Sequence, residues 1–166
     1  MARKAESVLR TRVKEALRPL HVVPVENGET DPGTPDVNYG GTVKWHPATG
    51  LWESWKDPSA IEGWMELKRG LVQQRSSSRV AITEQPGQKP WWETRSRAGG
   101  RIHVLVELYP ERLGRLPGFL WLEGSVATRL LNVASLSTLI EAAGRGYWCS
   151  NHRLEWACWL RTCLLM

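Results

Sequence analysis

The chain has 166 residues and a formal net charge of +5, from 22 Lys and Arg against 17 Asp and Glu, with a pI of about 9.4. A chain of this length buries about two-thirds of its unfolded surface, so we expect one domain that folds without a metal or a disulfide. The basic charge favours an anionic partner, with nucleic acid first and a membrane surface second. Ten Trp accompany one Phe, so the indoles either pack a core or stack on bases.

Two classes of protein are excluded by the pattern of apolar residues and cysteines. No apolar run is long enough to span a membrane, and "MARKAESVLRTRVKEAL" has charges where a signal peptide has its apolar core. We therefore expect no membrane association and a cytoplasmic location, in the host cytoplasm if a phage encodes the chain. Cys149, Cys158 and Cys163 are odd in number and lie near one another, which argues against a secreted disulfide framework.

In chain order, residues 4–18 have the spacing of an amphipathic helix that Pro19 ends. Residues 20–25 predict a short strand and residues 26–35 a loop. The segment "DVNYGG" predicts a second strand that turns at its glycine pair. Residues 42–60 place three Trp among turn formers and predict an extended hairpin or flap.

Residues 61–68 alternate in polarity, which predicts a strand with one face in the core and with Glu66 and Lys68 on the other face. Trp64 shares that polar face, so it is a candidate for lining a site there. Residues 69–79 are polar and predict a mobile loop. A helix is expected from about 85–88 to 98, where Gly99 and Gly100 follow.

The rest of the chain predicts strands over 101–108 and 119–124, joined by a turn. Helices are expected over 125–143 and 151–165, with Asn151 as the N-cap of the second. The order helix, strands, helix, strand and helices predicts an α/β class with a mixed sheet.

Three polar residues suggest a chemistry. Asp36 follows the stiff turn Gly33-Thr34-Pro35, and Glu66 and Lys68 lie two apart on one strand face, with Cα atoms about 6.6–6.8 Å apart. If the fold brings Asp36 to them, the two carboxylates repel unless a cation lies between them, and hard oxygen ligands select Mg²⁺ or Mn²⁺. Lys68 would then stabilise charge on a phosphate while the metal lowers the pKa of a water. This chemistry is phosphodiester hydrolysis.

The motifs "GTPD" (33–36) and "ELK" (66–68) resemble the signature of the PD-(D/E)XK nuclease superfamily. The closer similarity is to small stand-alone phage and bacterial nucleases of the VRR-NUC type, which are similar to Holliday junction resolvases. In these an N-terminal helix, a G-x-P-D turn, an E-L-K strand and a Q-x-x-W helix follow in this order. Here the last motif is 88–91, and the resemblance covers about residues 5–108.

The resemblance implies a restriction-endonuclease-like core, with a mixed β-sheet flanked by helices and extra C-terminal helices. The single nuclease domain would span 1–166, with the motif-bearing core over 1–108, an inserted hairpin or flap over 42–60, and a C-terminal strand and helices over 109–166. The step of thirty residues from Asp36 to Glu66 is long for the superfamily, and the insertion accounts for it.

Site roles also follow from the resemblance. Asp36 and Glu66 would bind Mg²⁺ or Mn²⁺ with the main-chain carbonyl of Leu67. Lys68 would be the catalytic lysine and Gln88 would support the site. A further acidic residue would come from the first helix, as Glu6 or Glu15. The simpler interpretations are a turn residue for Asp36 and a solvated strand face for Glu66 and Lys68. For Gln88 the simpler interpretation is a polar position in a first helical turn, and for Glu6 it is a surface charge.

We therefore expect a Mg²⁺-dependent DNA endonuclease that acts on branched or junction DNA, leaves 5′-phosphate and 3′-hydroxyl ends, and needs no nucleotide cofactor. Two symmetric nicks across a junction need two sites, which implies a homodimer. The apolar segment 153–166 would form part of its interface or would dock onto the chain's own sheet. The alternatives are a site-specific (homing-type) or nicking endonuclease on duplex DNA, a non-catalytic DNA-binding module of the same fold, and an assembly protein that only tethers DNA. The expected phosphate contacts are Arg69, Arg75, Arg79, Lys89, Arg95 and Arg97.

Overall fold

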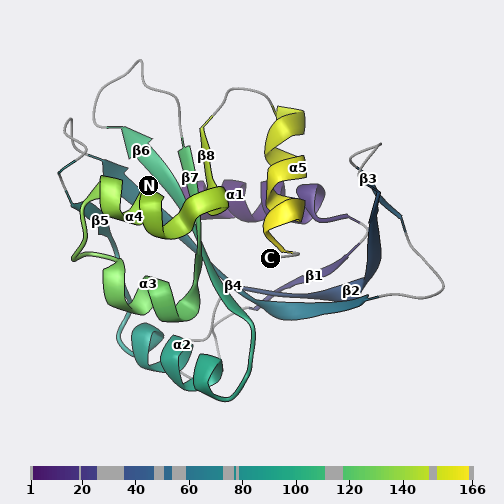
Figure 1. The fold of residues 1–166 in the computed structure, drawn as a ribbon, viewed down its shortest axis with the longest axis horizontal. Coiled ribbons are helices and arrows are strands. Elements are labelled where there is room, and N and C mark those ends of the chain that lie inside the picture. The colour runs from purple at the N-terminus through teal and green to yellow at the C-terminus, as the bar shows by residue number, and fades with distance from the viewer. Residues whose placement is uncertain are drawn as a thin grey trace.

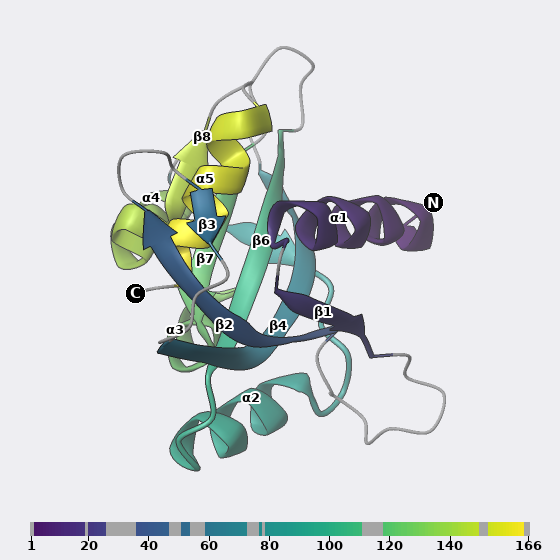
Figure 2. The ribbon, with the colours of Figure 1, turned by 90° about the vertical axis from the view of Figure 1, so that its right-hand side faces the viewer.

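The computed structural model describes residues 2–18, 20–25, 36–46, 51–53, 59–72, 77, 79–110, 118–149 and 153–164. Helices cover both faces of a mixed β-sheet (Figures 1 and 2). The predicted α/β class is therefore confirmed at this level. Its elements in chain order are α1 Ala2–Ala16, β1 His21–Pro24, β2 Val37–His46, β3 Leu51–Glu53, β4 Ser59–Val72, β5 Val80–Ile82, α2 Gln88–Arg97, β6 Ile102–Pro110, β7 Gly118–Glu123, α3 Gly124–Leu130, α4 Leu136–Ala143, a 3-10 turn Gly144–Gly146, β8 Tyr147–Cys149 and α5 Arg153–Cys163.

The sheet has the strand order β1-β2-β4-β6-β7-β8, with β3 paired to β2 and β5 paired to β4. Among the described pairs, β4 and β6 are parallel and the others are antiparallel. Parallel neighbours need a crossover connection, and α2 lies on the crossover between β4 and β6.

The edge of β4 that faces away from β6 is shared by two strands. β2 pairs with residues 59–65 and β5 pairs with residues 70–72. Within the described ranges, residues 66–69 have no strand partner on this edge. This interval is called the β4 gap below, and it positions the candidate site.

Two apolar clusters fix the helices on the sheet. Helix α1 buries Leu9, Val13 and Ala16 on one side, and they pack with Leu17, directly after the helix, on one face of the sheet together with α5. Helices α2, α3 and α4 cover the other face, where Trp92 is fully buried. Every Trp side chain that the structure describes belongs to one of these clusters, so these indoles serve packing.

The expected turn at the glycine pair is wrong, because β2 continues through Gly40 and Gly41 to His46. Both glycines pair within the sheet, opposite Glu62 and Ile61. Gly41 has a φ of 154°, which residues with a side chain rarely adopt, and a Cβ atom there would lie 2.9 Å from the Leu20 side chain. Backbone conformation and close packing within the strand account for this glycine. The expected hairpin over 42–60 is present in its described part, where β2 pairs with β3.

Three further expectations differ from the structure. The segment expected as a polar loop continues β4 to Val72, and β5 then pairs with it. The helix expected over 125–143 is divided into α3 and α4, because Asn132 adopts a left-handed φ of 65° and its amide oxygen accepts a hydrogen bond from Ile82 N–H. Strand β8 was not predicted. The expectations for Pro19, loop 26–35 and Asn151 lie outside the described residues.

Helix α5 docks onto its own chain. Trp156 and Leu160 are buried in the cluster under α1, and Arg161 Nε donates a 2.7 Å hydrogen bond to the Ala16 carbonyl. This packing covers the apolar side of α5, so of the two expected roles of this segment the structure has the docking onto its own chain. The homodimer stays a prediction, and its interface would have to lie elsewhere. Among the described helices, none has both the length and the apolar composition required to cross a bilayer.

The docking of α5 predicts that Leu160→Ala lowers the free energy of unfolding by about 2–5 kcal/mol, because it leaves a cavity under α1. Thr162→Ala, at an exposed position of the same helix, should change it by less than about 0.5 kcal/mol. Urea unfolding of the two variants checks this, and equal stabilities would contradict the docking.

Candidate active site

The β4 gap brings Asp36 to the strand that carries Glu66 and Lys68. Asp36 lies directly before β2, and its Oδ2 accepts a 3.0 Å hydrogen bond from the Leu67 N–H. The carboxylate therefore takes the place of a partner strand at a backbone group that would otherwise lack one. This contact joins positions 31 residues apart.

Strand geometry determines which groups of β4 face the gap. Successive residues of a strand direct their N–H and C=O groups to alternate edges of the sheet. Trp64 N–H donates to the Arg101 carbonyl on the β6 side, whereas the Gly63 carbonyl accepts from Asn38 Nδ2 on the β2 side. Leu67 alternates in step with Gly63, so both its N–H and its C=O face the gap beside Asp36.

Glu66 lies on the sheet face that α2 covers, and both of its polar neighbours bind the same oxygen. Gln88 Nε2 and Lys68 Nζ each lie 2.7 Å from Glu66 Oε1. Gln88 is in the first turn of α2, and its side-chain oxygen accepts a 2.9 Å hydrogen bond from Gln85 N–H, which fixes the orientation of its amide. The exposed fractions of Glu66, Lys68 and Gln88 are 1%, 6% and 3%. At Glu66 and Lys68 this face of β4 is therefore buried, so the simpler interpretation of a solvated strand face is wrong for these two residues.

The electrostatics of Glu66 are unusual for a glutamate. Burial, together with the nearby charge of Asp36, raises its pKa to about 8, although Lys68 acts in the opposite direction. Its second oxygen, Oε2, is buried without a hydrogen-bond partner in the structure. A buried oxygen of this kind requires a proton or a cation to offset the loss of solvation.

Arg10 of α1 was missing from the predicted site residues. Its Nη2 lies 3.2 Å from Asp36 Oδ1, so a guanidinium and a backbone N–H hold the two oxygens of this carboxylate. The sequence carried one signal: Arg10 follows Glu6 by four residues and therefore shares its side of the helix. The side chain of Glu6 lies outside the described ones, and Glu15 is exposed on α1.

The donors at the gap fit a hard divalent cation. They are two carboxylates and the Leu67 carbonyl, which are the oxygen types that Mg²⁺ and Mn²⁺ take, and Mg²⁺ usually keeps several waters besides. The unpartnered Glu66 Oε2 is a free donor atom of this set. Within the described residues, no group of three or more His, Cys, Asp or Glu side chains could hold a metal, so side chains there supply at most two ligands.

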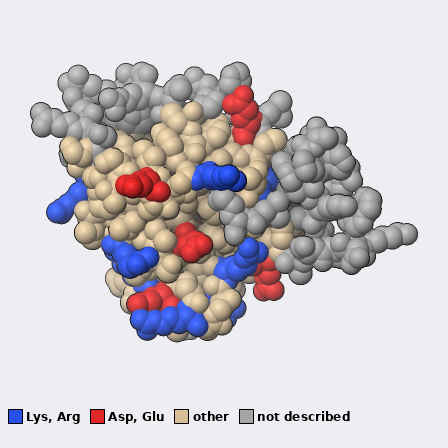
Figure 3. Space-filling model, in the orientation of Figure 1, with Lys and Arg blue, Asp and Glu red and all other residues tan. Residues whose placement is uncertain are grey.

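The predicted phosphate contacts divide into three groups. Arg69, Lys89 and Arg97 are ion-paired with Glu107, Glu84 and Glu93 respectively. The side chains of Arg79 and Arg95 are exposed, and Arg75 lies outside the described residues. Basic side chains, with acidic ones between them, gather over the lower part of the molecule in Figure 3, where Figure 1 shows α2.

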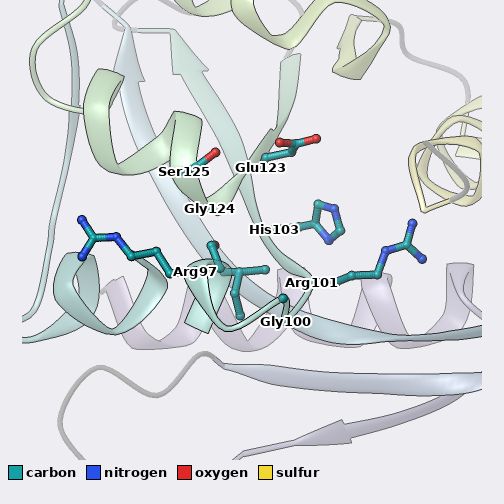
Figure 4. Close-up of a pocket in the computed structure, with 10 residues that line it drawn as sticks. Arg97, Gly100, Arg101, His103, Glu123, Gly124 and Ser125 are labelled. Atoms are coloured by element: carbon teal, nitrogen blue, oxygen red, sulfur yellow. The ribbon is translucent and has the colours of Figure 1, made fainter. Parts of the chain in front are cut away.

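A second polar region lies at the other end of α2. Arg97, Arg101, His103 and Glu123 line a cavity of about 440 Å³ together with glycine and serine residues, and the two arginines project in opposite directions (Figure 4). His103 Nδ1 lies 2.9 Å from the Tyr39 hydroxyl, and burial lowers the pKa of this histidine to about 4. The cavity is not lined by the residues of the β4 gap.

Comparison with protein-family models, with curated proteins and with solved structures gave no match. The chemistry of the site therefore rests on its own geometry and on the sequence motifs.

The raised pKa of Glu66 predicts a pH-dependent stability in the presence of EDTA. Between about pH 4.5 and 8 the folded protein holds a proton that the unfolded chain releases, so the free energy of unfolding should fall as the pH rises through this window. The slope is limited to about 1.4 kcal/mol per pH unit for one proton. In urea unfolding, Glu66→Gln should not show this fall in the free energy of unfolding with pH. Glu62→Gln, at an exposed position of the same strand, should still show it. Parallel profiles for wild type and Glu66→Gln would contradict the shift.

Proposed function

We propose that the chain is a metal-dependent endonuclease that hydrolyses phosphodiester bonds of DNA and has a restriction-endonuclease-like core. One observation carries the proposal: the residues that the sequence motifs single out gather at the β4 gap. Glu66 contacts Lys68 and Gln88 directly, and Asp36 accepts from the neighbouring Leu67 N–H and helps to raise the pKa of Glu66. A solvated surface strand would not gather and bury these groups.

The topology supports the proposed core. Helix α1 precedes the antiparallel strands β1, β2 and β4, and α2 crosses over to the parallel strand β6. The motif residues then lie at a strand entry, in a strand and in a first helical turn, in the order that the resemblance implies.

In this proposal Asp36, Glu66 and the Leu67 carbonyl would bind Mg²⁺ or Mn²⁺. When bound, the metal neutralises charge on the phosphate oxygens and lowers the pKa of a water. Glu66 must lose its proton before it can serve as a ligand. Gln88 holds Glu66 Oε1, which leaves Oε2 as the oxygen that would bind the metal. Lys68 supplies a fixed positive charge beside Glu66, where it would stabilise negative charge that develops on the phosphate.

DNA is the proposed substrate because the net charge is +5 and because Lys89, Arg95 and Arg97 lie on α2, whose first turn carries Gln88. A preference for branched or junction DNA, and the homodimer that paired nicks would require, rest on the resemblance to junction-resolving nucleases.

Labelled four-way junction, duplex and single-stranded DNA, each incubated with Mg²⁺ or with EDTA, test the proposal. Mg²⁺-dependent cleavage of the junction in preference to duplex supports a resolvase. Equal cleavage of duplex favours a site-specific or nicking endonuclease. Binding without cleavage favours a non-catalytic module, and an absence of binding would contradict DNA as the partner.

Asp36→Asn and Glu66→Gln should each lower the cleavage rate by about 10²-fold or more while DNA binding persists, because each keeps the shape of the side chain but removes a metal ligand. Lys68→Ala should lower the cleavage rate by a similar factor. Glu62→Gln makes the same chemical change as Glu66→Gln on the same strand, at an exposed position, and should cleave like wild type. Wild-type rates in either ligand variant would exclude this site.

The proposed phosphate contacts predict the salt dependence of DNA binding. The logarithm of the association constant should fall linearly with the logarithm of salt concentration, by about 0.9 for each phosphate neutralised on duplex DNA. Arg95→Gln should lower this slope by about one such step, whereas Arg145→Gln, in the exposed 3-10 turn, should leave it unchanged. Fluorescence anisotropy titrations measure both slopes, and a flat dependence in wild type would show that the basic charge does not bind DNA.

A further inference from the structure

Arg10 occupies the oxygen of Asp36 that faces away from the strand. Asp36 Oδ2 is held by the Leu67 N–H at 3.0 Å, and Oδ1 is held by Arg10 Nη2 at 3.2 Å. Glu66 Oε2 is buried and unpartnered in the same site. Arg10 therefore supplies positive charge to one carboxylate of the pair and leaves the other with a free oxygen.

The charges of the site balance in the ionised state of Glu66, which is the state that would bind a cation. When Glu66 is ionised, the two carboxylates face Arg10 and Lys68, and the formal charges sum to zero. A divalent cation that binds Asp36 and Glu66 would add two positive charges at a few ångströms from both basic groups. Repulsion then favours the departure of one of them.

Exposure decides which basic group can leave. The Lys68 side chain is only 8% exposed and lies against Glu66, whereas the Arg10 side chain is 33% exposed and its partner Asp36 is 20% exposed. Of the two ion pairs, Arg10–Asp36 is the more accessible to water, so it opens at a lower cost than Lys68–Glu66. The buried residues Leu9 and Val13 hold helix α1 on the sheet. The Arg10 side chain can therefore move while the backbone of α1 stays in place.

We propose that Arg10 is a positioning residue that holds Asp36 against the β4 gap until a divalent cation takes its place on Oδ1, and that the released guanidinium then binds a phosphate oxygen of the DNA. This inference rests on the proposed metal site. It makes Arg10 a competitor of the cation and a partner of the phosphate. Because the guanidinium serves only one of them at a time, cation and DNA strengthen the binding of each other.

The first test is isothermal titration calorimetry with Mn²⁺ in the absence of DNA. Arg10→Gln should bind Mn²⁺ about fivefold or more tightly than wild type, because the competitor is gone. If Arg10 instead supported the shape of the site, Arg10→Gln would bind Mn²⁺ more weakly than wild type, because Asp36 would lose its orientation.

Arg12→Gln is the matched control. Arg12 lies on the same helix, is 32% exposed and pairs with a different carboxylate, Glu107, at the same distance of 3.2 Å. It should leave Mn²⁺ affinity unchanged, which separates the local effect from the loss of one positive charge. Thermal unfolding establishes that the variants fold, and Arg10→Lys, which keeps the charge without the planar fork, should bind Mn²⁺ with intermediate affinity.

The second test measures DNA affinity by anisotropy with Ca²⁺ and with EDTA. Wild type should bind DNA about fivefold or more tightly with Ca²⁺ than with EDTA, and Arg10→Gln should lose most of this gain in affinity.

Unchanged or weaker Mn²⁺ binding by Arg10→Gln, or a full gain in DNA affinity with Ca²⁺ in that variant, would overturn the inference. A lack of Mn²⁺ binding by both proteins at millimolar concentration would overturn the inference and the metal site together. The expected Arg10 effects without cleavage of any DNA would contradict the proposed nuclease alone.

Discussion

The contact between the Asp36 carboxylate and the Leu67 N–H determines where the polar groups of this protein can meet. A sheet edge leaves backbone N–H groups that need partners, and β2 and β5 meet this need along most of β4. Between them the partner is a side chain instead of a strand. An ionised side chain at this point brings charge into the interior of an α/β layer structure, where a strand would have brought only amide groups.

A buried carboxylate pair is unfavourable unless its surroundings provide compensation. For Glu66 the compensation is asymmetric, since one oxygen has two donors at 2.7 Å and the other has none. Glu66 is buried on the sheet face that α2 covers, so bulk water does not solvate its free oxygen. The arrangement therefore leaves one buried oxygen that a proton or a cation would satisfy.

Local patterns predicted the elements that hold the site. The alternation over 61–68 placed Glu66 and Lys68 on one face, and the glycine pair at 99–100 marked the end of α2. What local patterns could not give depends on contacts across the chain. The glycine pair resembled a turn, but Gly41 lies within β2 with a positive φ and against the Leu20 side chain. Asn132 divides a helix through its hydrogen bond to Ile82, 50 residues away. Arg10 was missed for the same reason, because its partner is 26 residues further along the chain.

The packing of α5 against α1 has a consequence for the order in which the protein folds. Arg161 donates to the carbonyls of Ala16 and Arg18, and Trp156 and Leu160 complete the core beneath α1. During synthesis α1 leaves the ribosome first, whereas α5 follows about 140 residues later and emerges only after many seconds of elongation. Until then α1 lacks the part of its packing that α5 supplies. A ribosome-bound chain that ends before α5 would therefore carry all of the motif residues while this side of α1 is still uncovered.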